Sequence, residues 1–333
     1  MDKDTKIKLM KPSCRLLLQA CLNKNLDIID IDSYNNSFTV KVSNKLLYFK
    51  AIQTPLNNQS ARPLTKNKFI CKKLFTLYNL PTPNYVHIYK KSGLNQQNIN
   101  NIDKLLKKHK RIIAKPTNGM KSQNIFLDIN TREKALEAFQ NITTAPNKKY
   151  SGVLFEQFIP GDVYRLLFLE GNLIGALKRE PGFIIGDGNS QLDTLINWKN
   201  KFLDQSERDV GRIKKDQRLM NFLKSQGIES LAYIPKQDEK VFVDKDFSNL
   251  ETVTEVTKEV NPKIIYMISK MLLDVNLNLI GVDVISPDIS SEEFSIIEIN
   301  AEPSLDFHHY PDYGEAIDVA TKIINAVIKQ YTN

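Results

Sequence analysis

The chain has 333 residues, of which 41% are hydrophobic and 25% charged, a composition typical of a globular protein with two or three domains. It contains no apolar run of about 18 residues, which excludes a predicted membrane-spanning helix. The net charge of +8 comes from 46 Lys and Arg against 38 Asp and Glu. Nucleic acids and polyanionic small molecules such as nucleotides are therefore both candidate ligands.

Cysteine usage and the N-terminus favour a cytoplasmic protein. Cys14, Cys21 and Cys71 have no metal-type spacing and are odd in number, which indicates reduced thiols. The basic start of the chain has an apolar stretch of only 16–18, too short for a secretion signal. The lysine cluster at 104–111 has no interleaved aromatic residues that could stack on bases, so we favour a solvated helix face over nucleic-acid binding.

Turn residues and apolar periodicity predict the elements of the first half of the chain. A helix is expected at 13–22, three short strands at 26–31, 37–42 and 45–51, and a polar linker at 54–60. A lysine-rich helix follows at 67–78 and is ended by prolines. A strand is expected at 111–114 and another helix at 131–142.

The second half begins with a buried strand at 152–159 and a hairpin whose arms, 164–170 and 172–179, meet at Gly171. The remaining predicted helices are 191–202, 213–226, 262–275 and 315–331, and the remaining strands are 279–285 and 293–300. Because helices mix with antiparallel hairpins, the pattern indicates an α+β fold rather than a doubly wound parallel sheet.

Two predicted strands near the C-terminus carry carboxylates inside apolar runs. Asp283 lies in LIGVDVI, and Glu298 and Asn300 lie in FSIIEIN, two apart and therefore on one face of their strand. If the strands are neighbours, these side chains offer two carboxylates and a neutral carbonyl, hard oxygen ligands suited to Mg²⁺. The alternative is that the carboxylates pair with buried lysines or arginines.

Four cations stand at places where an anionic ligand could meet them. Lys68 begins a helix, Lys115 ends the strand IIAKP, and Arg165 and Arg179 sit on the two arms of the hairpin. Each lysine alone reads as a surface residue, but lysines and arginines facing a cleft hold phosphates. Gly186 and Gly188 bracket Asp187 in a turn whose amides could bind an anion or could simply cap the following helix.

Several segments together resemble ATP-grasp ligases of the glutathione synthetase and cyanophycin synthetase type, and above all the ligase half of bifunctional glutathione synthetases. The segments are ARPLTKNKFICKKLFTLYNLPTPNY, IIAKP, FEQFIPGDVYRLLFLEGNLIGALKREPGFIIGDGNSQLDTLI, GVDVI and IIEINAEPSLDFHHYP. The resemblance implies an ATP-grasp fold with the nucleotide between two α+β lobes and a small N-terminal α/β domain. The expected boundaries are 1–62 for the N-terminal domain, 63–154 for the central lobe and 155–333 for the C-terminal lobe.

The resemblance implies a role for each matching residue. Lys68 and Lys115 would hold ATP phosphates, Arg165 and Arg179 would neutralise the transferred phosphate, and Glu156, Gln157 and Phe158 would form the hinge beside adenine. Asp283, Glu298 and Asn300 would hold Mg²⁺, for which Mn²⁺ could substitute. The implied activity is an ATP-dependent carboxylate–amine ligase that forms a peptide-like amide through an acyl-phosphate and releases ADP and phosphate.

Two loops depart from the family pattern. The phosphate loop is Gly119-Met-Lys-Ser-Gln-Asn-Ile125, with one glycine where three are usual, and Lys121 or Ser122 could compensate by contacting phosphate directly. The loop at 245–257 lacks the usual glycine pair. These changes keep open the alternative of a catalytically impaired protein that binds nucleotide or a partner without turnover.

The substrates expected from the resemblance are a small molecule or peptide with a carboxylate and an amine acceptor, without nucleic acid or membrane. Relatives are commonly dimers or tetramers, so a homo-oligomer is expected. The pair His308-His309 reads as satisfied loop histidines that could also line the acceptor site.

Overall fold

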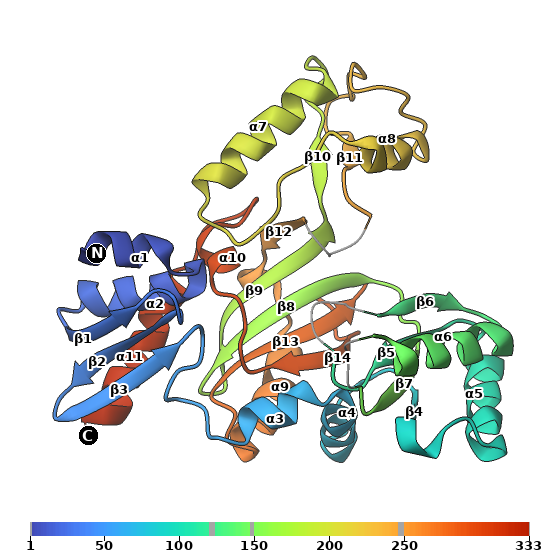
Figure 1. The fold of residues 1–333 in the computed structure, drawn as a ribbon, viewed down its shortest axis with the longest axis horizontal. Coiled ribbons are helices and arrows are strands. Elements are labelled where there is room, and N and C mark those ends of the chain that lie inside the picture. The colour runs from blue at the N-terminus through green and yellow to red at the C-terminus, as the bar shows by residue number, and fades with distance from the viewer. Residues whose placement is uncertain (1, 120–123, 147–149, 246–249, 333) are drawn as a thin grey trace. The chain divides into compact units, whose positions relative to one another are not determined.

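The computed structural model of the chain describes residues 2–119, 124–146, 150–245 and 250–332, and its ribbon is shown in Figure 1. Helices and mostly antiparallel strands alternate along the sequence, which confirms the predicted α+β class. Among the described residues, no helix combines the length and apolar composition needed to cross a bilayer.

The chain divides into two compact units, each built from separate stretches of sequence. The first unit contains 1–57, 173–258 and 302–333, and the second contains 58–172 and 259–301. The predicted division at 62/63 and 154/155 stays a prediction.

The first unit begins with helices α1 and α2 and the antiparallel sheet β1–β2–β3. The helices are α1 (Lys3–Leu9) and α2 (Pro12–Asn23), and the strands are β1 (Asp27–Asp32), β2 (Ser37–Val42) and β3 (Lys45–Lys50). The last helix, α11 (Val319–Thr332), packs against α2 and β2. Phe38 and Phe49 are buried and stack across β2 and β3 with ring centroids 4.6 Å apart. Segments from both ends of the chain therefore share one core.

The middle stretch of the first unit supplies short strands and two amphipathic helices. Its elements are β9 (Asn172–Pro181), β10 (Phe183–Ile185), α7 (Leu192–Gln205), α8 (Gln217–Lys224), β11 (Lys240–Phe242), β12 (Glu251–Glu255) and the 3-10 turn η2 (Thr257–Glu259). The short helix α10 (Asp306–His309) belongs to the last stretch of this unit. β9 pairs antiparallel with β12, and β10 with β11. Ile196 and Leu203 of α7 share a core with Leu219 and Leu223 of α8.

The second unit contains a four-stranded antiparallel sheet in the order β4–β7–β5–β6. Its elements are β4 (Tyr85–Tyr89), the 3-10 turn η1 (Lys90–Ser92), α5 (Gln96–His109), β5 (Ile112–Pro116), β6 (Phe126–Ile129), α6 (Arg132–Thr144) and β7 (Gly152–Gln157). Ile102 of α5, Ile142 of α6 and Phe155 of β7 meet in its core. Because β7 is a central strand, its residues from Gly152 to Glu156 are all buried.

The other part of the second unit contains α3 (Ala61–Lys66), α4 (Lys68–Leu77), β8 (Asp162–Leu169), α9 (Pro262–Asp274), β13 (Leu279–Ser286) and β14 (Ser295–Asn300). β13 lies between β8 and β14 and is antiparallel to both. The side chain of Asn67 caps α4 by accepting the backbone N–H groups of Phe69 and Ile70. α4 packs against β14, which brings the first turn of the helix to the carboxylate-bearing strand.

Candidate functional site

The predicted metal ligands lie on paired strands of the second unit. Asp283 on β13 is directly opposite Glu298 on β14, and Asn300 is opposite Gly281. Facing residues on antiparallel strands have Cβ atoms about 5 Å apart, so the two carboxylates are cross-strand neighbours. The structure therefore brings the predicted oxygen donors together, as the turn between their strands suggested.

Each of these carboxylates also has a cationic neighbour. Arg165, opposite Asp283 on β8, donates from Nε to one carboxylate oxygen and from Nη2 to the other, the second at 2.9 Å. Lys68 Nζ lies 2.5 Å from Glu298 Oε2 and also donates to the carbonyl of Gly119 at 3.3 Å. The ion pairing that the sequence left open as an alternative is present, and its cations are two of the predicted phosphate ligands.

The charges around Glu298 keep it ionised. Burial alone would raise the pKa of Glu298, but the positive charges of Lys68, Lys115 and Arg165 lower it to about 2. Burial lowers the pKa of Lys68, and the Glu298 carboxylate more than offsets this effect, so that the pKa of Lys68 is raised. At neutral pH this edge of the sheet therefore presents a carboxylate and an ammonium group, both charged.

A second cluster of charged side chains, Glu156, Lys72 and Lys115, is buried in the interior of the second unit. Glu156 on β7 lies between Lys72 of α4 and Lys115 of β5, with N···O distances of 3.1 and 2.7 Å. Lys72 also donates to Thr82 Oγ1 at 2.7 Å and to the carbonyl of Ile296 at 3.3 Å. Burial would raise the pKa of Glu156, but Lys115 and Lys72 lower it, whereas burial lowers the pKa of Lys72 to about 8.

Lys72 is the member of this site that the sequence analysis missed. A lysine within KFICKK reads as a solvated helix residue, yet Lys72 has no exposed surface. The signal was its position four residues after Lys68, because residues four apart lie on the same helix face. That this face of α4 contacts β14 is known only from the structure.

The predicted hinge residues lie at the end of β7. The Gln157 N–H donates to the carbonyl of Asn84 at 2.8 Å. The Arg111 guanidinium stacks 3.9 Å from the ring centroid of Phe158. The Glu156 side chain points into the buried lysine pair rather than to solvent. The adenine-binding role of these three residues stays a prediction.

Arg179 belongs to the first unit, on β9. It donates from Nε and Nη2 to the two carboxylate oxygens of Glu251 on β12, at 2.8 and 2.6 Å. The predicted phosphate ligands Lys121 and Ser122 lie outside the described residues, as do residues 246–249 of the second altered loop.

Two other sequence features have structural explanations. The carboxylate of Asp187 accepts the backbone N–H groups of Asn189 and Ser190 at 2.9 and 2.7 Å, so this glycine-flanked turn uses its own amides. His308 is fully buried and lies against Gly175. A Cβ added to Gly175 would lie 2.7 Å from Nδ1 of the His308 ring. The helix that follows this turn, α7, has Gln191 as its N-cap, and His308 and His309 lie in the short helix α10 rather than in a loop. An acceptor-site role for the two histidines stays a prediction.

The oxygen donors at this edge of the sheet suit a magnesium ion. Within the ranges that the structure describes, no group of three or more His, Cys, Asp or Glu side chains is placed to hold one. The predicted set has only two such groups, Asp283 and Glu298, and takes its third oxygen from the amide of Asn300. Two ionised carboxylates and an amide carbonyl are ligands that Mg²⁺ accepts when water and phosphate complete its shell. The side chains present fit magnesium.

Comparisons with known proteins agree with the resemblance seen in the sequence. Residues 80–229 match the family model described as prokaryotic glutathione synthetase, ATP-grasp domain. The chain is 26% identical over 328 residues to the glutathione biosynthesis bifunctional protein of Clostridium perfringens, covering 94% of this chain and 40% of that protein. It is 29% identical over 224 residues to the cyanophycin synthetase of Geminocystis herdmanii, covering 64% of this chain and 25% of that protein.

The fold is confirmed by a solved structure. The bifunctional glutathione synthetase of Pasteurella multocida superposes with a TM-score of 0.74 at 19% identity, covering 96% of this chain and 44% of that one. The chain has the ATP-grasp fold, and its resemblance to glutathione synthetases and cyanophycin synthetases is confirmed. It spans less than half the length of these relatives.

Proposed function

We propose that this chain is an ATP-dependent carboxylate–amine ligase that forms a peptide-like amide through an acyl-phosphate and releases ADP and phosphate. The observation that carries the proposal is a set of two carboxylates, each paired with a cation. Asp283 and Glu298 face each other on β13 and β14. Arg165 of β8 binds Asp283, and Lys68 of α4 binds Glu298. Phosphoryl transfer depends on such positioned charges more than on covalent chemistry by the protein.

In this proposal ATP is bound by the cations of the second unit. Lys68 and Lys115 provide two ammonium groups for the phosphates, and Glu156, Gln157 and Phe158 form the hinge beside adenine. Lys72 is fully buried and acts by holding Glu156. Asp283, Glu298 and Asn300 hold Mg²⁺ or Mn²⁺. An ion held there would supply positive charge against the phosphates. Lys121 and Ser122 remain candidate phosphate ligands.

Two arginines act on the group that is transferred. A substrate carboxylate attacks the γ-phosphate, the bond to ADP breaks, and an acyl-phosphate forms. Arg165 and Arg179 neutralise the phosphoryl oxygens, after which the amine attacks the acyl carbon and phosphate leaves. Both guanidiniums are held by two-point contacts with a carboxylate, Asp283 and Glu251 respectively, and are therefore oriented in advance.

The substrates are proposed as a class only: a small molecule or peptide with a free carboxylate, and an amine acceptor. The relatives' names suggest peptide-like products, and we propose the same for this chain. The three buried cysteines form no disulfide, which fits a reducing compartment such as the cytoplasm. A homo-oligomer remains part of the proposal and is measured by light scattering.

The test is an ADP-release screen with Mg·ATP over amino acids and short peptides. We expect ADP, rather than AMP, to appear only with a carboxylate and an amine together, and to disappear when EDTA removes the metal. Asp283→Asn and Glu298→Gln should each abolish it. Glu292→Gln is the matched control, because Glu292 lies in the preceding turn, is 63% exposed in its side chain and pairs with Lys263. Turnover in both site variants would contradict the proposal.

Calorimetry with Mg·ATP distinguishes the alternative of a nucleotide-binding protein without turnover. The single glycine of the loop at 119–125 motivates that alternative. Tight binding without ADP release across the whole panel would support it and contradict the ligase.

A further inference from the structure

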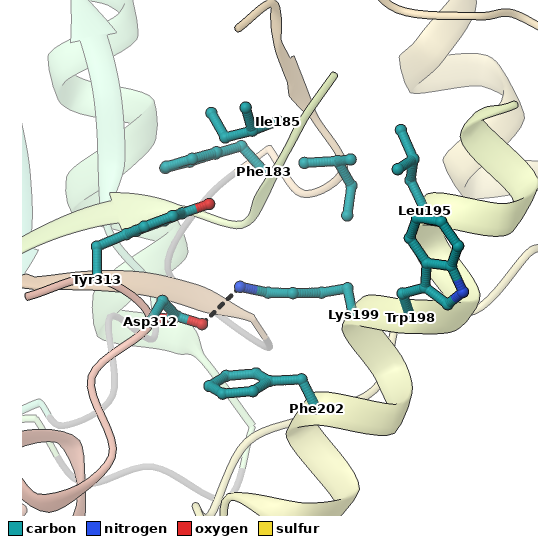
Figure 2. Close-up of a pocket in the computed structure, with 9 residues that line it drawn as sticks. Phe183, Ile185, Leu195, Trp198, Lys199, Phe202, Asp312 and Tyr313 are labelled. Carbon is teal, nitrogen blue, oxygen red and sulfur yellow. Dashed lines mark hydrogen bonds and ion pairs between the residues drawn. The ribbon is translucent and has the colours of Figure 1, made fainter. Parts of the chain in front are cut away.

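The first unit contains a cavity of about 260 Å³ that the proposed ligase mechanism does not use. It lies between α7, the strand β10 and the segment before α11, as shown in Figure 2. Its lining residues are Phe183, Ile184, Ile185, Leu195, Trp198, Lys199, Phe202, Asp312 and Tyr313. This volume lies just below the range of about 300–1,000 Å³ of sites for drug-sized ligands, so a smaller molecule is indicated.

Four aromatic side chains line the cavity, and three of them remain accessible. The rings of Phe183 and Tyr313 stack in parallel with centroids 5.9 Å apart. Trp198, Phe202 and Tyr313 keep 56%, 39% and 40% of their surface exposed. Covering such large apolar side chains with a ligand would be favourable in free energy. A flat apolar group could cover them, because aromatic rings favour stacked or edge-on contacts with another ring.

The polar floor of the cavity has an excess of positive charge. Asp312 accepts from Lys199 Nζ at 2.5 Å, from Arg208 Nη1 at 2.7 Å and from the backbone N–H of Val253 at 2.8 Å. One carboxylate therefore faces two cations. Lys240 approaches the Phe183 ring, but it pairs with Glu180 at 2.7 Å and adds no net charge.

Lys199 is the group that can contact a ligand. It reaches across the cavity from α7 to Asp312, as Figure 2 shows. Its ammonium lies 5.6 Å from the ring centroid of Phe202 and 6.0 Å from that of Tyr313. An ammonium has three donors, and Asp312 takes one of them. A ligand carboxylate could accept a hydrogen bond from a second donor of Lys199. A ligand cation would be repelled by Lys199, and Asp312 already accepts from three donors.

We propose that this cavity is a binding site for a small aromatic carboxylate, with its ring between the aromatic walls and its carboxylate on Lys199. The site does not depend on the proposed ligase reaction, because its residues all belong to the first unit and hold the ligand without ATP.

Trp198 makes a direct test possible, because it is the single tryptophan of the chain. We titrate the full chain without ATP with phenylacetate and follow Trp198 fluorescence, and the indole N–H signal by NMR. We expect a saturable change with phenylacetate and at least about tenfold weaker binding of phenylacetamide, since a charge-assisted hydrogen bond contributes about that much. Equal binding of the amide, tighter binding of benzylammonium, or no saturable change would overturn the proposal.

A matched pair of variants locates the carboxylate contact. Lys199→Met should weaken phenylacetate binding about tenfold or more, whereas Lys201→Met, two residues along the same helix and exposed, should not change it. Equal affinity in the two variants would contradict the assignment of Lys199. If Lys199→Met does not fold, the comparison of acid and amide on the unmodified protein still decides the matter.

Discussion

Asp283 on β13 and Arg165 on β8 occupy directly opposed positions and form a two-point ion pair. One partner is a proposed metal ligand and the other a proposed phosphate ligand. The side chain that would hold the metal ion and the side chain that would contact a phosphate therefore orient each other across a pair of antiparallel strands.

Arg165→Lys tests this arrangement, because lysine keeps the charge but loses the planar two-point contact. We expect kcat for ADP formation to fall about a hundredfold, the effect of removing one oriented donor from a developing charge. The KM for ATP should change much less. Arg132→Lys is the control, since Arg132 is about half exposed and pairs with Asp103 on the surface. An unchanged kcat in Arg165→Lys would remove Arg165 from the reaction.

Lys72→Met tests the buried cluster around Glu156. Removing one partner leaves Glu156 in the interior with Lys115 alone, and breaking a buried pair in this way costs about 3 kcal/mol. We expect the free energy of unfolding, measured with urea, to fall by that amount. Lys73→Met, the exposed neighbour on the same helix, should change it by less than about 0.5 kcal/mol. A similar small loss in both variants would show that the buried pair contributes little.

The low pKa of Lys72 predicts a pH dependence of stability. Its folded-state value is about 8, below the ordinary value of 10.5, so between these pH values the unfolded chain binds more protons. The stability of the wild type should therefore rise relative to Lys72→Met from pH 8 to pH 10, by an amount on the order of 2 kcal/mol. Urea unfolding of both proteins at the two pH values measures it. A constant difference would mean that Lys72 titrates normally.

Gly152→Ala should disturb the strand that carries Glu156. An added Cβ would lie 2.4 Å from the backbone oxygen of Ile88 on the paired strand β4, so the two strands must separate. We expect a loss of about 1–3 kcal/mol in the free energy of unfolding. At Gly227 no heavy atom of the described chain lies within 4 Å, but φ is +80°. Gly227→Ala therefore shows the cost of backbone strain without crowding. Gly152 has no such φ, so a loss well below about 1 kcal/mol in Gly152→Ala would contradict crowding at this position.

The strands of the carboxylate site could be predicted because their sequences combine two signals. LIGVDVI and IIEIN are apolar runs of strand length with a carboxylate inside, and both form central or paired strands at the predicted place. The helix that begins at Lys68 was predicted from its lysine-rich periodicity and its terminal prolines. Sequence spacing thus identified the side chains that meet on β13 and β14.

Other elements could not be read from the sequence for identifiable reasons. β10, β11 and β12 have only 3 to 5 residues, too few to show an alternating pattern. The predicted helix at 213–226 is shorter, Gln217–Lys224, because the side chain of Asp216 caps it at Leu219. Lys72 was missed because the groups that bind its ammonium, the Glu156 carboxylate of β7 and the Ile296 carbonyl of β14, are far away in sequence.

The second unit is made of two stretches with residues 173–258 between them, which sets an order for its assembly during synthesis. Lys72, Lys115 and Glu156 are all translated before residue 160 and can meet early. Lys68 and Arg165 receive Glu298 and Asp283 only after β13 and β14 leave the ribosome. A nascent chain halted before residue 279 could therefore bring Lys72, Lys115 and Glu156 together, but it would lack the strand β14 that covers Lys72 and the carboxylates that pair with Lys68 and Arg165.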